Sequence, residues 1–245
     1  TGAANVSLSE ATKSQNVILT SPGDGASASV AVTGTGNTSR VITISSFSGN
    51  GSLALALASG TATDAAGNSA AASSAQAGIS ALPVIVVDNT PPTVSVSGPS
   101  IADARASSSV TYTVTYSGAS LITLKASDIT VNKTGDASAS VAVSGTGTST
   151  RTVTLSGFKG NGAIGISVAS GTARDLAGNL AAAPESASGT FAVDTAAPLV
   201  SVSAPSLTNV KADSTVTYTV NYTGATNVTL AASDIVVKPS GTASA

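Results

Sequence analysis

The side chains best suited to chemistry lie in two similar stretches, GTARDLAGN and GTATDAAGN, which end at Asn179 and Asn68. Each places a carboxylate four residues before the amide, Asp175 in one stretch and Asp64 in the other. Carboxylate and amide oxygens are ligands that calcium prefers, and the ion takes six to eight of them. The same residues also suit a turn, because Asp accepts backbone N–H bonds and glycine adopts positive φ freely. A motif that occurs twice in one chain indicates a building block rather than a single active centre.

One such loop supplies too few oxygens for calcium, so further ligands must come from elsewhere. The linkers VDNTPP and VDTAAP contribute Asp88 and Asp194 at the ends of the building blocks. If loop and linker share one end of the fold, two carboxylates and an amide converge at each joint. The second linker departs from the first, because Thr195 replaces Asn89 and Ala197 replaces Pro91. The predicted calcium ligands at the repeat junctions are Asp64, Asn68, Asp88, Asp175, Asn179 and Asp194.

The composition excludes several classes of function. Only 9% of the 245 residues are charged and the net charge is −2, so nothing favours binding to nucleic acid. The chain contains neither Cys nor His, which removes disulfides, thiolate chemistry and the commonest general base. We therefore expect no enzyme and no catalytic residue. No apolar run reaches the roughly 18 residues that span a bilayer, so we expect no direct insertion into a membrane.

Internal repetition is the strongest signal in the sequence. The segment VDNTPPTVSVSGPS at Val87 returns as VDTAAPLVSVSAPS at Val193, 106 positions later. The stretch that ends at Asn68 matches the one that ends at Asn179 with an offset of 111. Such a period, somewhat above a hundred residues, fits one small domain per repeat.

Alternation of apolar and polar residues predicts that each repeat is made of strands. In VTYTVTY, residues 110–116, the Val and Tyr side chains share one face, and the Thr side chains share the other. The same period places Val153 and Leu155, and then Ile164, Ile166 and Val168, on inward faces. Short strands separated by turn residues indicate an all-β fold of tandem antiparallel immunoglobulin-like β-sandwiches in an extended string.

The register of the repeats predicts three domains of unequal completeness. Residues 1–90 form a partial repeat that lacks the first strands, residues 91–197 a complete repeat, and residues 198–245 a partial repeat with the first strands only. Two interpretations remain open. The chain is a window of a longer array, or it is a subunit whose last strands complete the first sandwich of the next subunit.

The motifs VDNTPPTVSVS, GTAxDxAGN and VTYTVTYSG together resemble the tandem bacterial immunoglobulin-like repeats of large surface adhesins and biofilm proteins. The resemblance covers essentially the whole chain. It implies an extracellular or cell-surface location and a role as a stalk or spacer that holds a distal binding module away from the cell. Some similar repeats bind calcium between neighbouring domains, so the resemblance also implies calcium as a candidate cofactor.

Two classes of function follow. The first is a structural segment of a surface protein or fibre, whose partners are neighbouring repeats or identical subunits. The alternative is an adhesive module that recognises glycan or another cell surface. Exposed aromatic rings would favour that alternative, and the candidates are Phe47 and Phe158, which lie just before Gly-rich turns. Core packing explains the same two rings.

Overall fold

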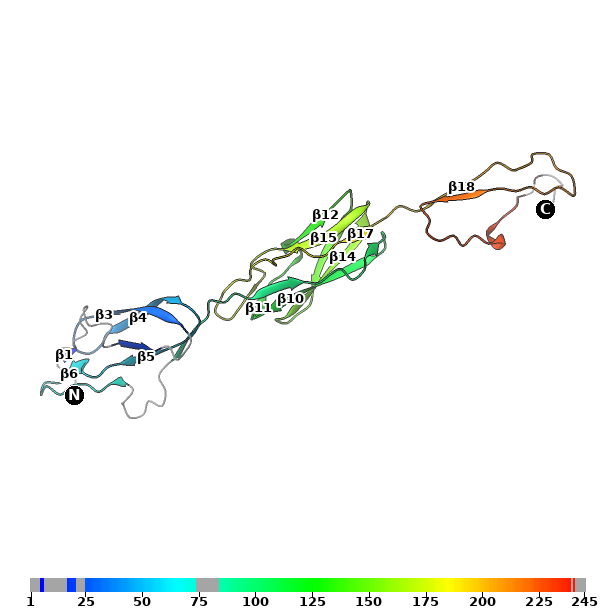
Figure 1. Ribbon diagram of the computed structural model, residues 1–245. Helices are drawn as coiled ribbons and strands as arrows, with labels where there is room; N and C mark the ends of the chain where they lie inside the picture. Colours follow the sequence, from blue (N-terminus) through cyan, green and yellow to red (C-terminus); the bar gives the residue numbers. More distant parts are fainter. Residues whose placement is uncertain (1–4, 7–16, 21–24, 74–83, 239, 241–245) are drawn as a thin grey trace.

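The computed structural model describes residues 5–6, 17–20, 25–73, 84–238 and 240. These residues form strands and turns, with 3-10 turns at Ala126–Asp128 and Ala232–Asp234 and no α-helix, as the sequence predicts. Figure 1 shows three groups of strands that follow one another end to end. We call them the first segment (5–87), the middle segment (93–193) and the last segment (199–240). None of the described residues forms a helix that is long and apolar enough to cross a membrane.

The middle segment contains two four-stranded sheets. Its strands are β8 (Thr93–Val96), β9 (Asp103–Ala104), β10 (Ser109–Ser117), β11 (Leu121–Ile122), β12 (Ile129–Lys133), β13 (Ser138–Ser144), β14 (Thr150–Lys159), β15 (Gly162–Val168), β16 (Ala173–Arg174) and β17 (Phe191–Val193). One sheet has the order β13-β14-β10-β8, and the other has the order β12-β15-β17-β9. The short strands β11 and β16 pair beside them.

The two sheets share one apolar core. Every second residue of β10 is buried, from Val110 to Tyr116, and these side chains join those of β14, β15 and β17 in a single cluster. Tyr112 of one sheet packs against Phe191 of the other, with ring centroids 6.4 Å apart. Phe158 meets Phe191 edge to face at 5.4 Å. This arrangement is consistent with a β-sandwich whose layers are held together by aliphatic and aromatic packing.

One pairing differs from the predicted antiparallel pattern. Strands β9 and β17 run parallel, with Asp103 opposite Ala192 and Ala104 opposite Val193. The chain leaves β8 in one sheet, passes Pro99 and joins the other sheet as β9 without reversing its direction. Gly98 and Pro99 are residues that interrupt a strand, but nothing in the sequence indicates that the chain continues on the opposite sheet.

The described part of the first segment has the same kinds of sheet, with fewer strands than the middle segment. Its strands are β1 (Asn5–Val6), β2 (Val17–Thr20), β3 (Ser27–Thr33), β4 (Val41–Ser48), β5 (Gly51–Leu57), β6 (Ala62–Thr63) and β7 (Val84–Val87). They form the sheets β3-β4 and β2-β5-β7 and the pair β1-β6. Among the residues whose burial is described, Leu53 is buried with Ala26 and Val87.

The last segment has a single pair of strands among its described residues, β18 (Leu199–Val202) and β19 (Val220–Thr223). No facing sheet covers this pair within the described chain. Apolar side chains of this segment are consequently exposed, including Val200 of β18 at 59% and Tyr218, just before β19, at 58%.

Candidate functional site at the joint between segments

The loop that follows β16 is a tight turn closed by Asp175. Its carboxylate oxygen Oδ1 accepts the backbone N–H groups of Gly178 at 2.7 Å and Asn179 at 2.9 Å. The amide Nδ2 of Asn179 donates to the second oxygen, Oδ2, at 2.8 Å. Gly178 has φ of +98°, which only glycine adopts without cost. Asp175, Gly178 and Asn179, which the motif shares, therefore each have a role in the turn.

The equivalent loop in the first segment has the same geometry. Oδ1 of Asp64 accepts the backbone N–H groups of Ala66 and Asn68, and Oδ2 accepts the Asn68 amide at 2.9 Å. Gly67 has φ of +88°. The two aspartates differ in exposure. Asp175 is 6% exposed, and Asp64 is more accessible.

Hydrogen bonding keeps both carboxylates in their charged form. For Asp64, the amide and backbone of Asn68 hold the pKa below its ordinary value. For Asp175, burial raises the pKa, but the hydrogen bonds from Asn179 and from the adjacent backbone N–H groups outweigh burial, so the pKa is lowered as well.

The loop of the middle segment also reaches the linker that joins it to the first segment. Nδ2 of Asn179 donates to the backbone carbonyl oxygen of Asp88 at 2.8 Å, across 91 positions of sequence. The amide thus bridges the Asp175 carboxylate and the linker carbonyl. This contact places the loop at the end of the middle segment that faces the first segment.

The first segment holds the same linker from the other side. Oδ1 of Asn50 accepts the backbone N–H of Asn89 at 2.6 Å, and Nδ2 of Asn89 donates to the carbonyl of Gly49 at 2.6 Å. Nδ2 of Asn50 donates to the hydroxyl of Thr90 at 2.8 Å. The carboxylate of Asp88 accepts the backbone N–H of Thr90, which closes a local turn within the linker.

The second linker is anchored in the same way despite its different sequence. Oδ1 of Asn161 accepts the backbone N–H of Thr195 at 2.8 Å, and the Thr195 hydroxyl donates to the carbonyl of Gly160 at 3.1 Å. The carboxylate of Asp194 accepts the backbone N–H of Ala196 at 2.9 Å. Thr195 therefore replaces Asn89 as a donor to an equivalent carbonyl.

The structure distributes the predicted calcium ligands over three places. Asp88, Asp175 and Asn179 lie together at the first linker, where hydrogen bonds join them. Asp194 lies at the second linker, and Asp64 and Asn68 lie at the β6 end of the first segment, away from Asp88 (Figure 1). Within the described ranges, no three His, Cys, Asp or Glu side chains are grouped so that they could hold a metal ion. The arrangement at the first linker is suited to fixing the joint by direct hydrogen bonds.

Sequence reasoning missed Asn50 and Asn161, the residues that anchor the linkers. Both occupy the middle of a GNG turn, and this turn is present in both repeats. The motif was interpreted only as a turn between strands. Its recurrence with an asparagine between the glycines was the signal that could have identified a polar anchor.

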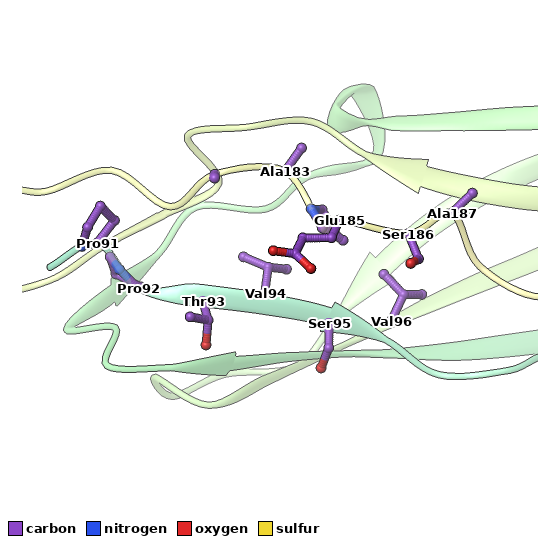
Figure 2. A pocket seen from close by; sticks show the side chains of 12 residues that line it. Pro91, Pro92, Thr93, Val94, Ser95, Val96, Ala183, Glu185, Ser186 and Ala187 are labelled. Atoms are coloured by element: carbon purple, nitrogen blue, oxygen red, sulfur yellow. The ribbon is translucent and has the colours of Figure 1, made fainter.

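A second candidate site is a surface cavity of about 470 Å³ between β8 and residues 182–187. Figure 2 shows Val94 and Val96 on the side of β8 that faces this stretch, and the Glu185 carboxylate beside Val94. Thr93 and Ser95 point to the other side. The lining is aliphatic apart from this carboxylate and a few hydroxyls, and no aromatic or basic side chain contributes to it. The cavity thus has no aromatic ring for a sugar to stack on and no positive charge to hold an anion.

The two aromatic candidates for glycan contact have different environments. Phe158 is 3% exposed and belongs to the core of the middle segment. Phe47, at the equivalent position of the first segment, is 42% exposed.

Acidification should open the Asp175 loop. Because the folded-state pKa is lowered, the ionised carboxylate stabilises the loop at every pH above the unfolded value of about 4. This stabilisation is lost as the pH falls through the lowered pKa. The backbone amide resonances of Gly178 and Asn179 should therefore shift together in an NMR titration, with a midpoint below about 4. An Asp175→Asn variant should lack this transition, and a midpoint at or above the ordinary value would contradict the expected hydrogen-bond geometry.

Comparison of the chain with protein-family models, with curated proteins and with solved structures finds no match. Function must therefore be inferred from the repeats, the joint and the exposed strands themselves.

Proposed function

We propose that this chain is a structural segment of an extracellular bacterial surface protein or fibre, in which it acts as a stiff spacer. The observation that carries this proposal is the first linker, which is hydrogen-bonded from both sides. Asn50 of the first segment and Asn179 of the middle segment both hold residues 88–90. A linker restrained in this way limits bending between the segments that it joins.

The spacer is built from tandem immunoglobulin-like domains, with boundaries at residues 1–90, 91–197 and 198–245. Several features support this interpretation: the repeat periods in the sequence, the two facing sheets of the middle segment and the switch of the chain from β8 to β9. Repeated domains joined by short linkers make extended arrays, because each domain contacts only its neighbours.

The resemblance of the repeats to those of bacterial adhesins supports the placement at the cell surface. The partners in this role are neighbouring repeats or identical subunits. Catalysis has no part in the proposal, since the sequence has no His or Cys to act as base or nucleophile.

Paired spin labels test the stiffness of the joint. Because the chain has no cysteine, Ser29→Cys and Ser140→Cys can label two exposed positions, one on each side of the linker. We expect a narrow distance distribution by pulsed EPR for this labelled chain. Asn179→Ala removes the bridge to Asp88, and a loss of about one to two kcal/mol raises the population of bent joints about five- to thirtyfold. The distribution should therefore broaden.

Asn68→Ala is the matched control, because Asn68 makes a similar turn and its hydrogen bonds in the described structure join it to Asp64 of its own loop. It should leave the distribution narrow in the dilute protein. Adding calcium or a chelator should not change the width, because the joint is held by hydrogen bonds. A broad distribution in the parent labelled chain would refute the stiff spacer, and narrowing by calcium would instead support the cation site.

A further inference from the structure

Strand β8 is the outer strand of its sheet in the middle segment. It pairs with β10 along one edge, with Val94 opposite Tyr116 and Val96 opposite Val114. Along its other edge, no strand of the described chain pairs with it. The edge belongs to a segment whose residues, 93–193, are all described. An edge of this kind presents N–H and C=O groups on which a further strand can form.

One hydrogen bond shows which backbone groups of β8 face the open edge. The N–H of Ser97 donates to the carbonyl of Thr113 in β10 at 2.9 Å. The bonding direction alternates along an antiparallel pair. Ser95 therefore also bonds toward β10, while Val94 and Val96 direct their N–H and C=O groups away from it. These four groups have no hydrogen-bond partner among the described residues.

The stretch 182–187 forms the opposite wall of the cavity beside β8. Just before it, Ala181 donates its N–H to the carbonyl of Ala173, and just after it, Ser188 donates to the carbonyl of Ile166. Between these anchors, no backbone group is hydrogen-bonded to another described residue. The cavity of about 470 Å³ between this wall and β8 lies within the range of about 300–1,000 Å³ that is usual for binding pockets.

The cavity gives access to the apolar core of the middle segment. Val94 and Val96 are half-buried and pack against that core. Figure 2 shows both side chains on the side of β8 that faces residues 182–187. The opposite wall carries the short side chains of three alanines, which leave room for side chains that enter from outside. A strand added to the open edge would place every second side chain in this space.

Glu185 gives the cavity its one charge. No other charged side chain lines the space, and Figure 2 shows the carboxylate beside Val94. Among the described residues, no hydrogen bond or ion pair engages the Glu185 carboxylate. An ammonium or guanidinium group of an occupant complements this charge and makes a charge-assisted hydrogen bond to it. The lining therefore favours an occupant that is aliphatic and carries a positive charge.

We propose that this seam, formed by β8 and residues 182–187, binds an extended segment of a partner protein by strand addition. The bound segment has short aliphatic side chains at every second position and a Lys or Arg beside them. Its backbone bonds the open groups of Val94 and Val96, its aliphatic side chains enter the cavity, and its cation meets Glu185. The inference depends on the middle segment alone and not on the proposed role as a spacer.

The edge that is open to such pairing is short. Pro91 and Pro92, which precede β8, have no N–H to donate, and Gly98 and Pro99 follow it. The bound segment therefore pairs with only two residues of β8, and most of its specificity comes from the cavity and the carboxylate. For a short peptide, we expect a dissociation constant on the order of 0.1–1 mM.

An NMR titration of the isotope-labelled chain with a synthetic peptide tests the seam. The probe is a six-residue peptide with blocked ends, in which valine and threonine alternate after an initial lysine. We expect a saturable shift of the amide resonances of Val94, Val96 and residues 182–187. Glu185→Lys should weaken binding about tenfold or more, because attraction becomes repulsion. Asp213→Lys changes the net charge equally at an exposed position of the last segment and should leave binding unchanged.

Modified peptides test strand addition without any change to the protein. N-methylation of alternate residues removes the N–H groups along one edge of the peptide and leaves the other edge intact. Only one edge of an added strand faces β8. One of the two N-methylated peptides should therefore lose binding about tenfold or more, and the other should bind like the unmodified peptide. Replacing the peptide's lysine by glutamate should weaken binding to the parent chain and restore binding to the Glu185→Lys chain.

Four results would overturn the inference. The first three are unshifted resonances at Val94 and Val96, equal binding of the two N-methylated peptides, and equal affinity of the parent and Glu185→Lys chains. The fourth is a shift at Val94 and Val96 that appears without peptide as the protein concentration rises, since the occupant would then be a second copy of the chain. Each result leaves the spin-label distances across the first linker unchanged, so a failure of the seam is distinct from a failure of the spacer.

Discussion

Tyr112→Ala will lower the free energy of unfolding of the middle segment by about 3–5 kcal/mol, the range for removing a large buried aromatic side chain. Tyr112 is fully buried, packs on Phe191, and donates its hydroxyl to the carbonyl of Gly189 at 3.0 Å. The substitution leaves a cavity between the sheets and removes one of the two hydroxyl donors to the Gly189 carbonyl, the other being Ser188. Denaturant unfolding, monitored by hydrogen exchange of peptides from residues 93–193, measures the loss in the free energy of unfolding.

Tyr218→Ala provides the matched control at the equivalent position of the last segment. Because Tyr218 is 58% exposed, its removal should change the stability of the dilute chain by less than about 1 kcal/mol. Equal losses for the two tyrosines would contradict the covered core of the middle segment and the uncovered face of the last segment.

Gly162→Ala will destabilise the middle segment by about 3 kcal/mol or more, from backbone strain and overpacking together. Gly162 begins β15 with φ of +148°, and an added Cβ would collide with the backbone carbonyl oxygen of Thr134. That carbonyl belongs to the neighbouring turn, so it cannot move aside as a flexible side chain does. Chemical denaturation of the parent chain and of the Gly162→Ala variant measures the two unfolding midpoints.

Gly147→Ala separates the two causes. Gly147 also has positive φ, +83°, but a Cβ at this position meets no atom within 4 Å. Its substitution should cost about 1–2 kcal/mol from backbone strain alone. A loss at Gly162 no larger than that at Gly147 would show that the turn relaxes around the added methyl group.

The faces of the strands could be predicted from the sequence, because side chains alternate strictly in a strand. The inward assignment of Val153, Leu155, Ile164 and Ile166 is confirmed, since all four are fully buried. Tyr218, which the repeat makes equivalent to the buried Tyr112, shows the limit of this pattern, because it is 58% exposed. Periodicity gives the face of a residue, but burial also requires a facing sheet.

Contacts that depend on how distant turns meet could not be predicted. The bond from Asn179 to the Asp88 carbonyl joins residues 91 positions apart, and nothing local specifies it. The parallel pairing of β9 depends on which sheet the chain joins after Pro99. The backbone at Ser46 could not be predicted either. Ser46 adopts φ of +54°, although the middle segment has Gly157 at the equivalent position.

The parallel pair β9–β17 has a consequence when the ends of the molecule are pulled apart. Tension enters the middle segment through Thr93, before β9, and leaves through Val193, at the end of β17. Two parallel strands pulled from opposite ends slide past each other. The bonds from Ala192 to the Ala102 carbonyl and from Asp194 to the Ala104 carbonyl are then strained at the same moment rather than one after another. This short patch therefore resists stretching by shear.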